Sequence, residues 1–203
     1  MFNSKIAILL IIIVLLIIPT PVSADVGNIG KNSSIEIAPI TLKSSMTIKA
    51  KSPEIVYNPY NISIKSNISI EKAYDMLSGT TYQTKECAKA FVEAENLDNP
   101  INSIFLIALT RLESGHGKNI LATNQNNISS WRISRGGYRT FESKASCIKD
   151  TASLLSKQYI SPSGLYHKGT SIWNIGTSYS ESNIWAENVN IISYELLNKY
   201  KNN

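Results

Sequence analysis

One segment, Ser103–Gly117, constrains the fold of this chain more than any other. Its apolar residues recur at the spacing of one helical face: Ile104, Ile107, Ala108 and Leu112. This spacing predicts a buried helix from Ser103 to Glu113. Gly115 and Gly117 follow at once, and glycine permits the left-handed turn that ends a helix. The sequence therefore predicts a core helix that ends at a carboxylate.

Other stretches from residue 69 onward have the same helical period. Ser69, Thr84 and Ser143 are each placed to cap the start of a helix, and a last helix is expected over 184–200. Between the third and fourth helical stretches lies a polar segment, 128–141, in which Gly136-Gly137 is a signal for a hairpin turn. The arms of this hairpin carry four large apolar residues: Trp131, Ile133, Tyr138 and Phe141. The expected fold class is α+β, mainly α, with a helical domain over 69–203 and a small β-hairpin lobe.

The chain begins with an unbroken apolar run, Ile6–Ile18, after a single charged residue, Lys5. A helix of 13 residues spans about 20 Å, short of the ~30 Å hydrocarbon core of a bilayer. The small-residue pattern Val22-Ser23-Ala24 follows it. We interpret residues 1–24 as a secretory signal peptide. The alternative is an uncleaved segment that tethers the protein to the membrane, and both alternatives predict an extracellular or wall-associated protein.

Residues 25–68 are rich in Ser, Asn, Lys and Ile and have only weak period-two character. We expect an extended spacer there, which contains glycosylation sequons at Asn32, Asn61 and Asn67. Outside the cytoplasm a disulfide can persist, so Cys87 and Cys147 form either one disulfide or two buried thiols.

Several classes of partner are not expected. The formal net charge is +5, but no run of Lys or Arg exceeds two residues, so a dedicated nucleic-acid arm is not predicted. The sequence contains no cluster of His, Cys and Asp at ligand spacing and no glycine-rich phosphate loop, so we expect neither a metal nor a nucleotide cofactor. We also expect a monomer.

Glu113 is the first candidate for catalysis. At the carboxyl end of an apolar helix, both the helix dipole and the surrounding apolar side chains disfavour the charged carboxylate. Both effects raise its pKa, as a general acid requires.

The ordered motifs of the domain resemble the glucosaminidase family, glycoside hydrolase family 73. The resemblance covers about 69–195 and centres on Leu112-Glu113-Ser114-Gly115-x-Gly117. It continues through further segments in the family's order: Asn126-Asn127, Tyr138-x-x-Phe141, Gly169-Thr170-Ser171-Ile172 and Tyr179-x-x-x-x-x-Trp185-Ala186. The resemblance implies a lysozyme-like fold and cleavage of β-linked N-acetylglucosaminyl bonds in a wall glycan.

Carried over by position, the resemblance implies that Glu113 is the catalytic acid and that Tyr179 contacts the sugar beside the cleaved bond. We expect these two residues to face one groove. The candidates for substrate binding are Asn127, Trp131, His116 and Tyr138. Trp131 is either a sugar platform or core, Asn127 either a site residue or a turn residue, and His116 either a cleft residue or an exposed loop residue.

The second carboxylate of a glycosidase is missing from its expected place, since no acidic residue lies between Asn127 and Phe141. Glu181 is the preferred alternative and Glu142 the other. A third route needs no second enzyme carboxylate, because the 2-acetamido oxygen of the substrate can attack the anomeric carbon.

The predicted function is that of a secreted hydrolase of a wall glycan, either peptidoglycan or a related polymer such as pseudomurein. A protein of a different class, an inactive wall-glycan-binding module on the same fold, is the alternative.

Overall fold

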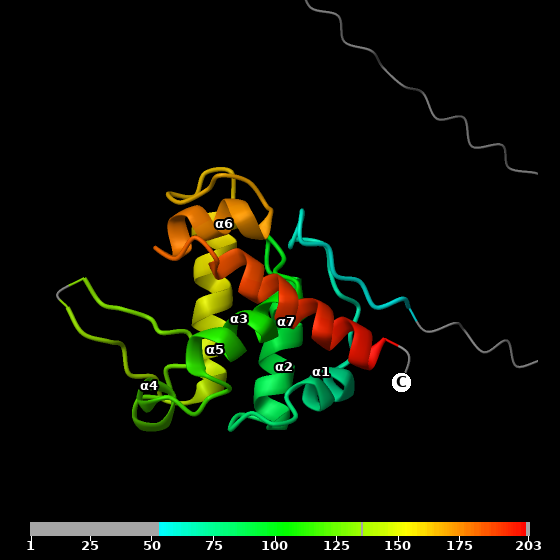
Figure 1. The fold of residues 1–203 in the computed structure, drawn as a ribbon, viewed down its shortest axis with the longest axis horizontal. Helices are drawn as coiled ribbons and strands as arrows, with labels where there is room; N and C mark the ends of the chain where they lie inside the picture. Colours follow the sequence, from blue (N-terminus) through cyan, green and yellow to red (C-terminus); the bar gives the residue numbers. More distant parts are fainter. Residues whose placement is uncertain (1–52, 135, 202–203) are drawn as a thin grey trace, which may run out of the picture. The chain divides into compact units, whose positions relative to one another are not determined.

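A computed structural model describes residues 53–134 and 136–201 of the chain. The predicted signal peptide and residues 25–52 of the predicted spacer lie outside these residues. The described part is mainly helical (Figure 1). Its helices are α1 (Ile70–Met76), α2 (Lys85–Glu93), α3 (Ser103–Ser114), α4 (Ile120–Asn124), α5 (Lys144–Leu154), α6 (Ile172–Tyr179) and α7 (Trp185–Tyr200), with a 3₁₀ turn at Ala94–Asn96 and a π-helix at Leu155–Ile160. Within these residues, no helix combines the length and apolar character needed to cross a bilayer.

Side-chain caps set the starts of the predicted helices. The hydroxyls of Ser69, Thr84 and Ser143 each accept a hydrogen bond from a backbone N–H in the first turn of the helix that follows. This confirms α1, α2 and α5 as predicted. The short helices α4 and α6 were not predicted from the sequence; they start in the same way, at Asn119 and Ser171.

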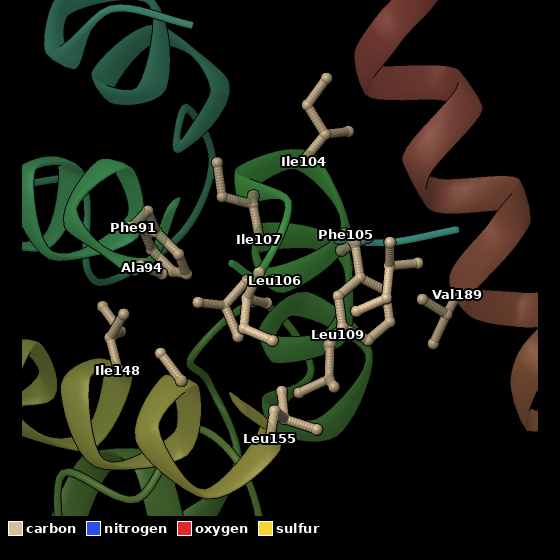
Figure 2. Close-up of a cluster of buried hydrophobic side chains, with 14 of the residues drawn as sticks. Phe91, Ala94, Ile104, Phe105, Leu106, Ile107, Leu109, Ile148, Leu155 and Val189 are labelled. Carbon is tan, nitrogen blue, oxygen red and sulfur yellow. The ribbon is translucent and has the colours of Figure 1, made fainter. Parts of the chain in front are cut away.

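Helix α3 is the centre of the core. All its residues from Ser103 to Arg111 are buried, so it is covered on every side and not only along one stripe. It packs against α2 and α7. Figure 2 shows its side chains between Phe91 of α2 and Val189 of α7, with Ile148 of α5 nearby. Burial on all sides fixes the axis of α3 and thereby the position of Glu113 in its last turn.

The end of α3 is a run of three left-handed residues. Gly115, His116 and Gly117 have φ angles of 55°, 60° and 82°. A Cβ atom at Gly117 would collide with the side chains of Thr81 and Tyr82, so this position requires glycine. Thr81 makes two hydrogen bonds to this turn. Its N–H donates to the carbonyl of His116 at 3.1 Å, and its hydroxyl donates to the carbonyl of Gly117 at 2.8 Å. The turn thus ties the end of α3 to the loop after α1.

The described part of the predicted spacer packs on the helices. Tyr57, Ile62 and Ile68 are buried in the same hydrophobic cluster as α3. The side-chain amide of Asn102 donates to the carbonyls of Val56 and Ile64, at 3.1 and 2.8 Å. The packed part of the domain therefore includes residues before 69, where the helical pattern of the sequence begins.

The predicted β-hairpin lobe is not confirmed. In residues 53–134 and 136–201 the region 128–141 contains a single antiparallel bridge, between Arg132 and Tyr138, and no strand. Between these two positions, Ile133, Ser134, Gly136 and Gly137 are exposed and do not form the cross-strand apolar pairs that stabilise a sheet. The region is a long loop that folds back on itself.

The two cysteines lie on neighbouring helices, Cys87 on α2 and Cys147 on α5. Both are buried free thiols. Burial raises the pKa of each thiol, which keeps both protonated and unreactive.

Candidate active site

Glu113 is held at the end of α3 by bonds to both its side chain and its backbone. Oε1 of its carboxyl group accepts a 2.9 Å hydrogen bond from Nε1 of Trp185, the first residue of α7. Its backbone carbonyl accepts hydrogen bonds from the Ser130 hydroxyl and the Asn119 side-chain amide, each at 3.0 Å. The bond from Trp185 sets the direction of the side chain, and the two bonds to the carbonyl hold the backbone of the last turn.

The surroundings of Glu113 favour its neutral form. Burial raises the pKa of the carboxyl group above its ordinary value of 4.5, and hydrogen bonds from Trp185 and Ser130 oppose this increase without cancelling it. No ion pair in the described part of the chain involves Glu113. A half-buried carboxyl group with a raised pKa and no cationic partner is suited to donating a proton.

Glu113 lines a cavity of about 500 Å³. Five of the residues proposed from the sequence line this cavity together: Glu113, Trp131, Tyr138, Tyr179 and Glu181. They come from α3, the loop 128–141, α6 and the segment after it. The expectation that Glu113 and Tyr179 face one groove is confirmed.

Tyr179 belongs to an aromatic wall of this cavity. Its ring centroid lies 4.9 Å from that of Trp185 and 5.8 Å from that of Tyr159, which also lines the cavity. Burial raises the pKa of Tyr179 well above 10, and the nearby Glu113 carboxylate raises it further. The phenol therefore keeps its proton and can donate a hydrogen bond to a ligand.

Trp131, in the loop between α4 and α5, also lines the cavity. The guanidinium of Arg139 stacks at 5.0 Å from the centroid of Trp131 and at 4.6 Å from that of Phe141. Asp150 of α5 holds the same guanidinium through a 2.6 Å ion pair. Trp131 is thus half-buried against the protein on one side and contributes to the cavity on the other.

Two residues on the rim are exposed. Tyr138 is 38% exposed, and the guanidinium of Arg132 lies 5.5 Å from its ring centroid. Glu181 is also exposed, two residues beyond the end of α6. Glu142 does not line the cavity.

Asn127 and His116 do not line the cavity. Asn127 is fully buried, and its side chain donates to the carbonyls of Trp131 and Arg139, each at 2.9 Å, and accepts from the N–H of Trp131 at 2.9 Å. It therefore orders the loop that carries Trp131. His116 is exposed, and its Nδ1 lies 3.0 Å from Nη1 of Arg111. The partial desolvation of the ring and the positive charge of Arg111 both lower the pKa of His116.

The sequence reasoning missed several residues in and around the cavity. Trp185 entered the sequence analysis only as part of the family motif; it is buried and does not line the cavity, but its indole N–H bonds Glu113. Several further lining residues carry small hydroxyl or apolar side chains without a motif of their own: Ser129, Ser130, Thr151, Leu154, Ser180 and Ser182. Among the described residues, no group of three or more His, Cys, Asp or Glu side chains is arranged to hold a metal ion.

No protein-family model and no curated protein matches the chain. Solved structures do match. A structure of S. aureus autolysin E in complex with the muropeptide NAM-L-Ala-D-iGlu has a TM-score of 0.53 at 16% identity, covering 74% of this chain and 75% of that chain. A catalytic mutant of S. aureus autolysin E in complex with the disaccharide NAG-NAM gives the same values. A further structure of autolysin E has a TM-score of 0.51 at 18% identity, over 70% of this chain and 72% of that chain. The chain therefore has an autolysin E-like fold, which confirms the glucosaminidase-like fold that the ordered motifs predict.

Proposed function

From the fold shared with autolysin E and the cavity around Glu113, we propose that this chain hydrolyses a bacterial-type wall glycan. The substrate is a polymer with β-linked N-acetylglucosaminyl bonds, and peptidoglycan is the first candidate. Glu113 is the general acid. The complexes of autolysin E with a muropeptide and a disaccharide support this class of ligand by analogy.

The observation that carries the proposal is the state of Glu113. A general acid must be protonated before it can protonate the leaving oxygen of the glycosidic bond. Burial in the wall of a 500 Å³ cavity raises the pKa of Glu113, and the Trp185 hydrogen bond fixes which oxygen is engaged. The other carboxyl oxygen remains to face a sugar in the cavity.

Tyr179 and Trp131 form the walls between which a sugar fits. The faces of pyranose rings are apolar, and aromatic rings suit them, while the phenol of Tyr179 supplies a hydrogen bond at the cleaved bond. The cavity volume lies in the range of small-molecule sites in proteins, so it holds one or a few sugar rings and not a whole strand.

Two routes remain for the attack on the anomeric carbon. Glu181 is the only carboxylate besides Glu113 among the described residues that line the cavity, and it stands exposed at the rim. From there it can activate a water molecule. In the other route the 2-acetamido oxygen of the substrate attacks and Tyr179 orients that group. Both routes use Glu113 as the proton donor.

The N-terminal segment predicts the compartment in which the protein acts. We propose that residues 1–24 direct secretion and that the protein acts outside the cell or on its wall, either free or tethered through 6–18. Residues 25–52 then separate the domain from that segment.

The experiment that tests the proposal uses Glu113→Gln, which keeps the shape of the side chain but removes the titrating proton. Release of new reducing ends from purified peptidoglycan should fall at least about 10³-fold. The circular dichroism spectrum should be unchanged, which would show that the fold is retained. If the unmodified protein binds peptidoglycan but releases no reducing ends, the chain is a binding module. Retained hydrolysis by the variant would contradict the role of Glu113.

A further inference from the structure

A second cavity, of about 250 Å³, lies beside the first. The two cavities share two lining residues, Trp131 and Leu154. The rest of the second cavity is lined by Asp150, Ser153, Lys157 and Gln158. A sugar that rests on Trp131 in the first cavity therefore has the second cavity at its side.

The second cavity is built on one continuous face of α5 and the π-helix that follows it. Asp150, Ser153, Leu154, Lys157 and Gln158 recur at the spacing i, i+3, i+4, i+7 and i+8, which places them in one row. The helical backbone thus holds this row in a fixed position against Trp131.

Gln158 presents donor groups to this cavity. Its side-chain oxygen accepts the backbone N–H of Leu165 at 3.2 Å, and its backbone carbonyl accepts that of Tyr166 at 2.9 Å. A Cβ atom at Gly164 would collide with the backbone of Gln158, so the loop packs close at this point. Because the oxygen of the amide is engaged with the loop, the NH₂ group is the part left to bind a ligand.

The charges around the cavity leave one cation without a counterion. Asp150 is the only carboxylate among the described lining residues, and the 2.6 Å ion pair with Arg139 neutralises it. Lys157 is exposed, and no carboxylate in the described part of the chain forms an ion pair with it. The lining therefore combines an ammonium group, an amide NH₂ and the hydroxyl of Ser153, a set of donors that suits an anion.

We propose that the second cavity is a subsite for a carboxylate of the glycan and that Lys157 binds it. The proposal rests on the proposed function, because a sugar must first occupy the cavity of Glu113. The carboxylate belongs either to a sugar ring or to a substituent on the neighbouring sugar. The subsite makes the protein select an acidic polymer over a neutral polymer with the same backbone linkage.

Binding to three probes tests the proposal in the full chain carrying Glu113→Gln, which prevents turnover. The probes are a neutral chitin oligomer, a peptidoglycan oligosaccharide freed of its stem peptides so that its lactyl carboxylates are exposed, and a hyaluronan oligosaccharide with ring carboxylates. Adding Lys157→Gln should weaken binding of a carboxylated probe up to about fivefold, the range of an exposed ion pair, and leave chitin binding unchanged. The loss should shrink at high salt.

The matched control is Lys149→Gln, because Lys149 is an exposed lysine of α5 that does not line the cavity and pairs with Glu93. It should change the affinity for none of the probes. The carboxylated probe that responds to Lys157→Gln identifies the source of the carboxylate. If Lys157→Gln affects all three probes equally or none of them, the subsite is refuted and the proposed function stands. If the parent binds no probe, the proposed function fails together with the subsite.

Discussion

Nε1 of Trp185 donates a 2.9 Å hydrogen bond to Oε1 of Glu113, and 72 residues separate the two in sequence. This bond joins the first residue of α7 to the last turn of α3, the two helices that pack together through the core. It stabilises the charged carboxylate, while burial of Glu113 stabilises the neutral acid. The balance between the two sets the pH at which Glu113 holds a proton.

Trp185→Phe removes this hydrogen bond and keeps an aromatic ring in the core. The bond lowers the pKa of Glu113, so its loss should raise that pKa further. Hydrolysis needs the protonated acid, and the alkaline limb of kcat/KM should therefore move to higher pH. A pH–rate profile on solubilised peptidoglycan measures the shift. Trp173→Phe, on α6 and 37% exposed, is the control and should leave the profile in place. An alkaline limb that does not move in Trp185→Phe would show that Glu113 is not the titrating group.

The raised pKa of Glu113 also predicts how stability depends on pH. Above pH 4.5 the unfolded carboxyl group loses its proton while the folded one keeps it, so the folded state binds more protons and loses stability as pH rises. This loss ends at the raised pKa of the folded protein. Glu113→Gln lacks the effect, so it should match the unmodified protein below pH 4.5 and exceed it in Tm at neutral pH. Thermal melts across this range measure the difference. Glu142→Gln, an exposed change outside the cavity, keeps Glu113 and should show the same dependence of Tm on pH as the unmodified protein.

Tyr179→Phe removes one donor from the cavity and keeps the ring stack with Trp185. We expect kcat to fall about 10²-fold, as for the loss of one donor in an active site, with a smaller change in KM. Because the pKa of Tyr179 lies well above 10, the pH–rate profile of the unmodified protein should show no limb from this phenol below pH 10. Tyr60→Phe, at a side chain that is 72% exposed, is the matched control. An equal loss in both variants would argue against a role for the Tyr179 hydroxyl.

Asn127→Ala should lower the free energy of unfolding by about 2–3 kcal/mol, because it leaves two buried carbonyls without their donor. The loop that holds Trp131 should also loosen, and KM should rise more than kcat falls. Urea denaturation with steady-state kinetics measures both. Asn124→Ala, at an exposed position of α4, should alter neither quantity. A variant with full stability would mean that the three hydrogen bonds of Asn127 do not order this loop.

The two cysteines should behave as buried thiols. Ellman's reagent should detect no thiol in the native protein and two after denaturation, and a reductant should leave Tm unchanged. A fall in Tm on reduction would reveal a disulfide between Cys87 and Cys147 in the secreted protein.

The sequence predicted those features that depend on neighbouring residues. The helix starts at Ser69, Thr84 and Ser143 follow from one side chain and the N–H groups of the next turn, and all three are confirmed. The end of α3 follows from the glycines after Glu113, whose left-handed backbone the structure contains. Such local rules need no knowledge of the rest of the chain.

Features that depend on distant contacts were missed. The hydrogen bond between Trp185 and Glu113 and the packing of Tyr57 and Ile62 on the helices have no local signal. The predicted hairpin is not confirmed for the opposite reason: its arms meet at a single bridge, between Arg132 and Tyr138, and no strand forms among the described residues. The side-chain amide of Asn127 and the guanidinium of Arg139 hold the segment as a loop instead.

Ser66 and Asn102 take part in hydrogen bonds between the segment before α1 and the rest of the domain. These bonds limit how far the chain can be shortened. The carboxyl group of Glu95, 5% exposed, accepts from the N–H groups of Ser66 and Ser103 at 2.9 and 2.8 Å. Cutting the chain at residue 69 would remove Ser66, whose N–H and hydroxyl are two of the three groups in the described part of the chain that donate to the buried Glu95 carboxyl group, and would take Ile62 out of the hydrophobic core. A shortened form of the protein for crystallisation should therefore start ahead of Tyr57, although the sequence of that stretch alone predicts a spacer.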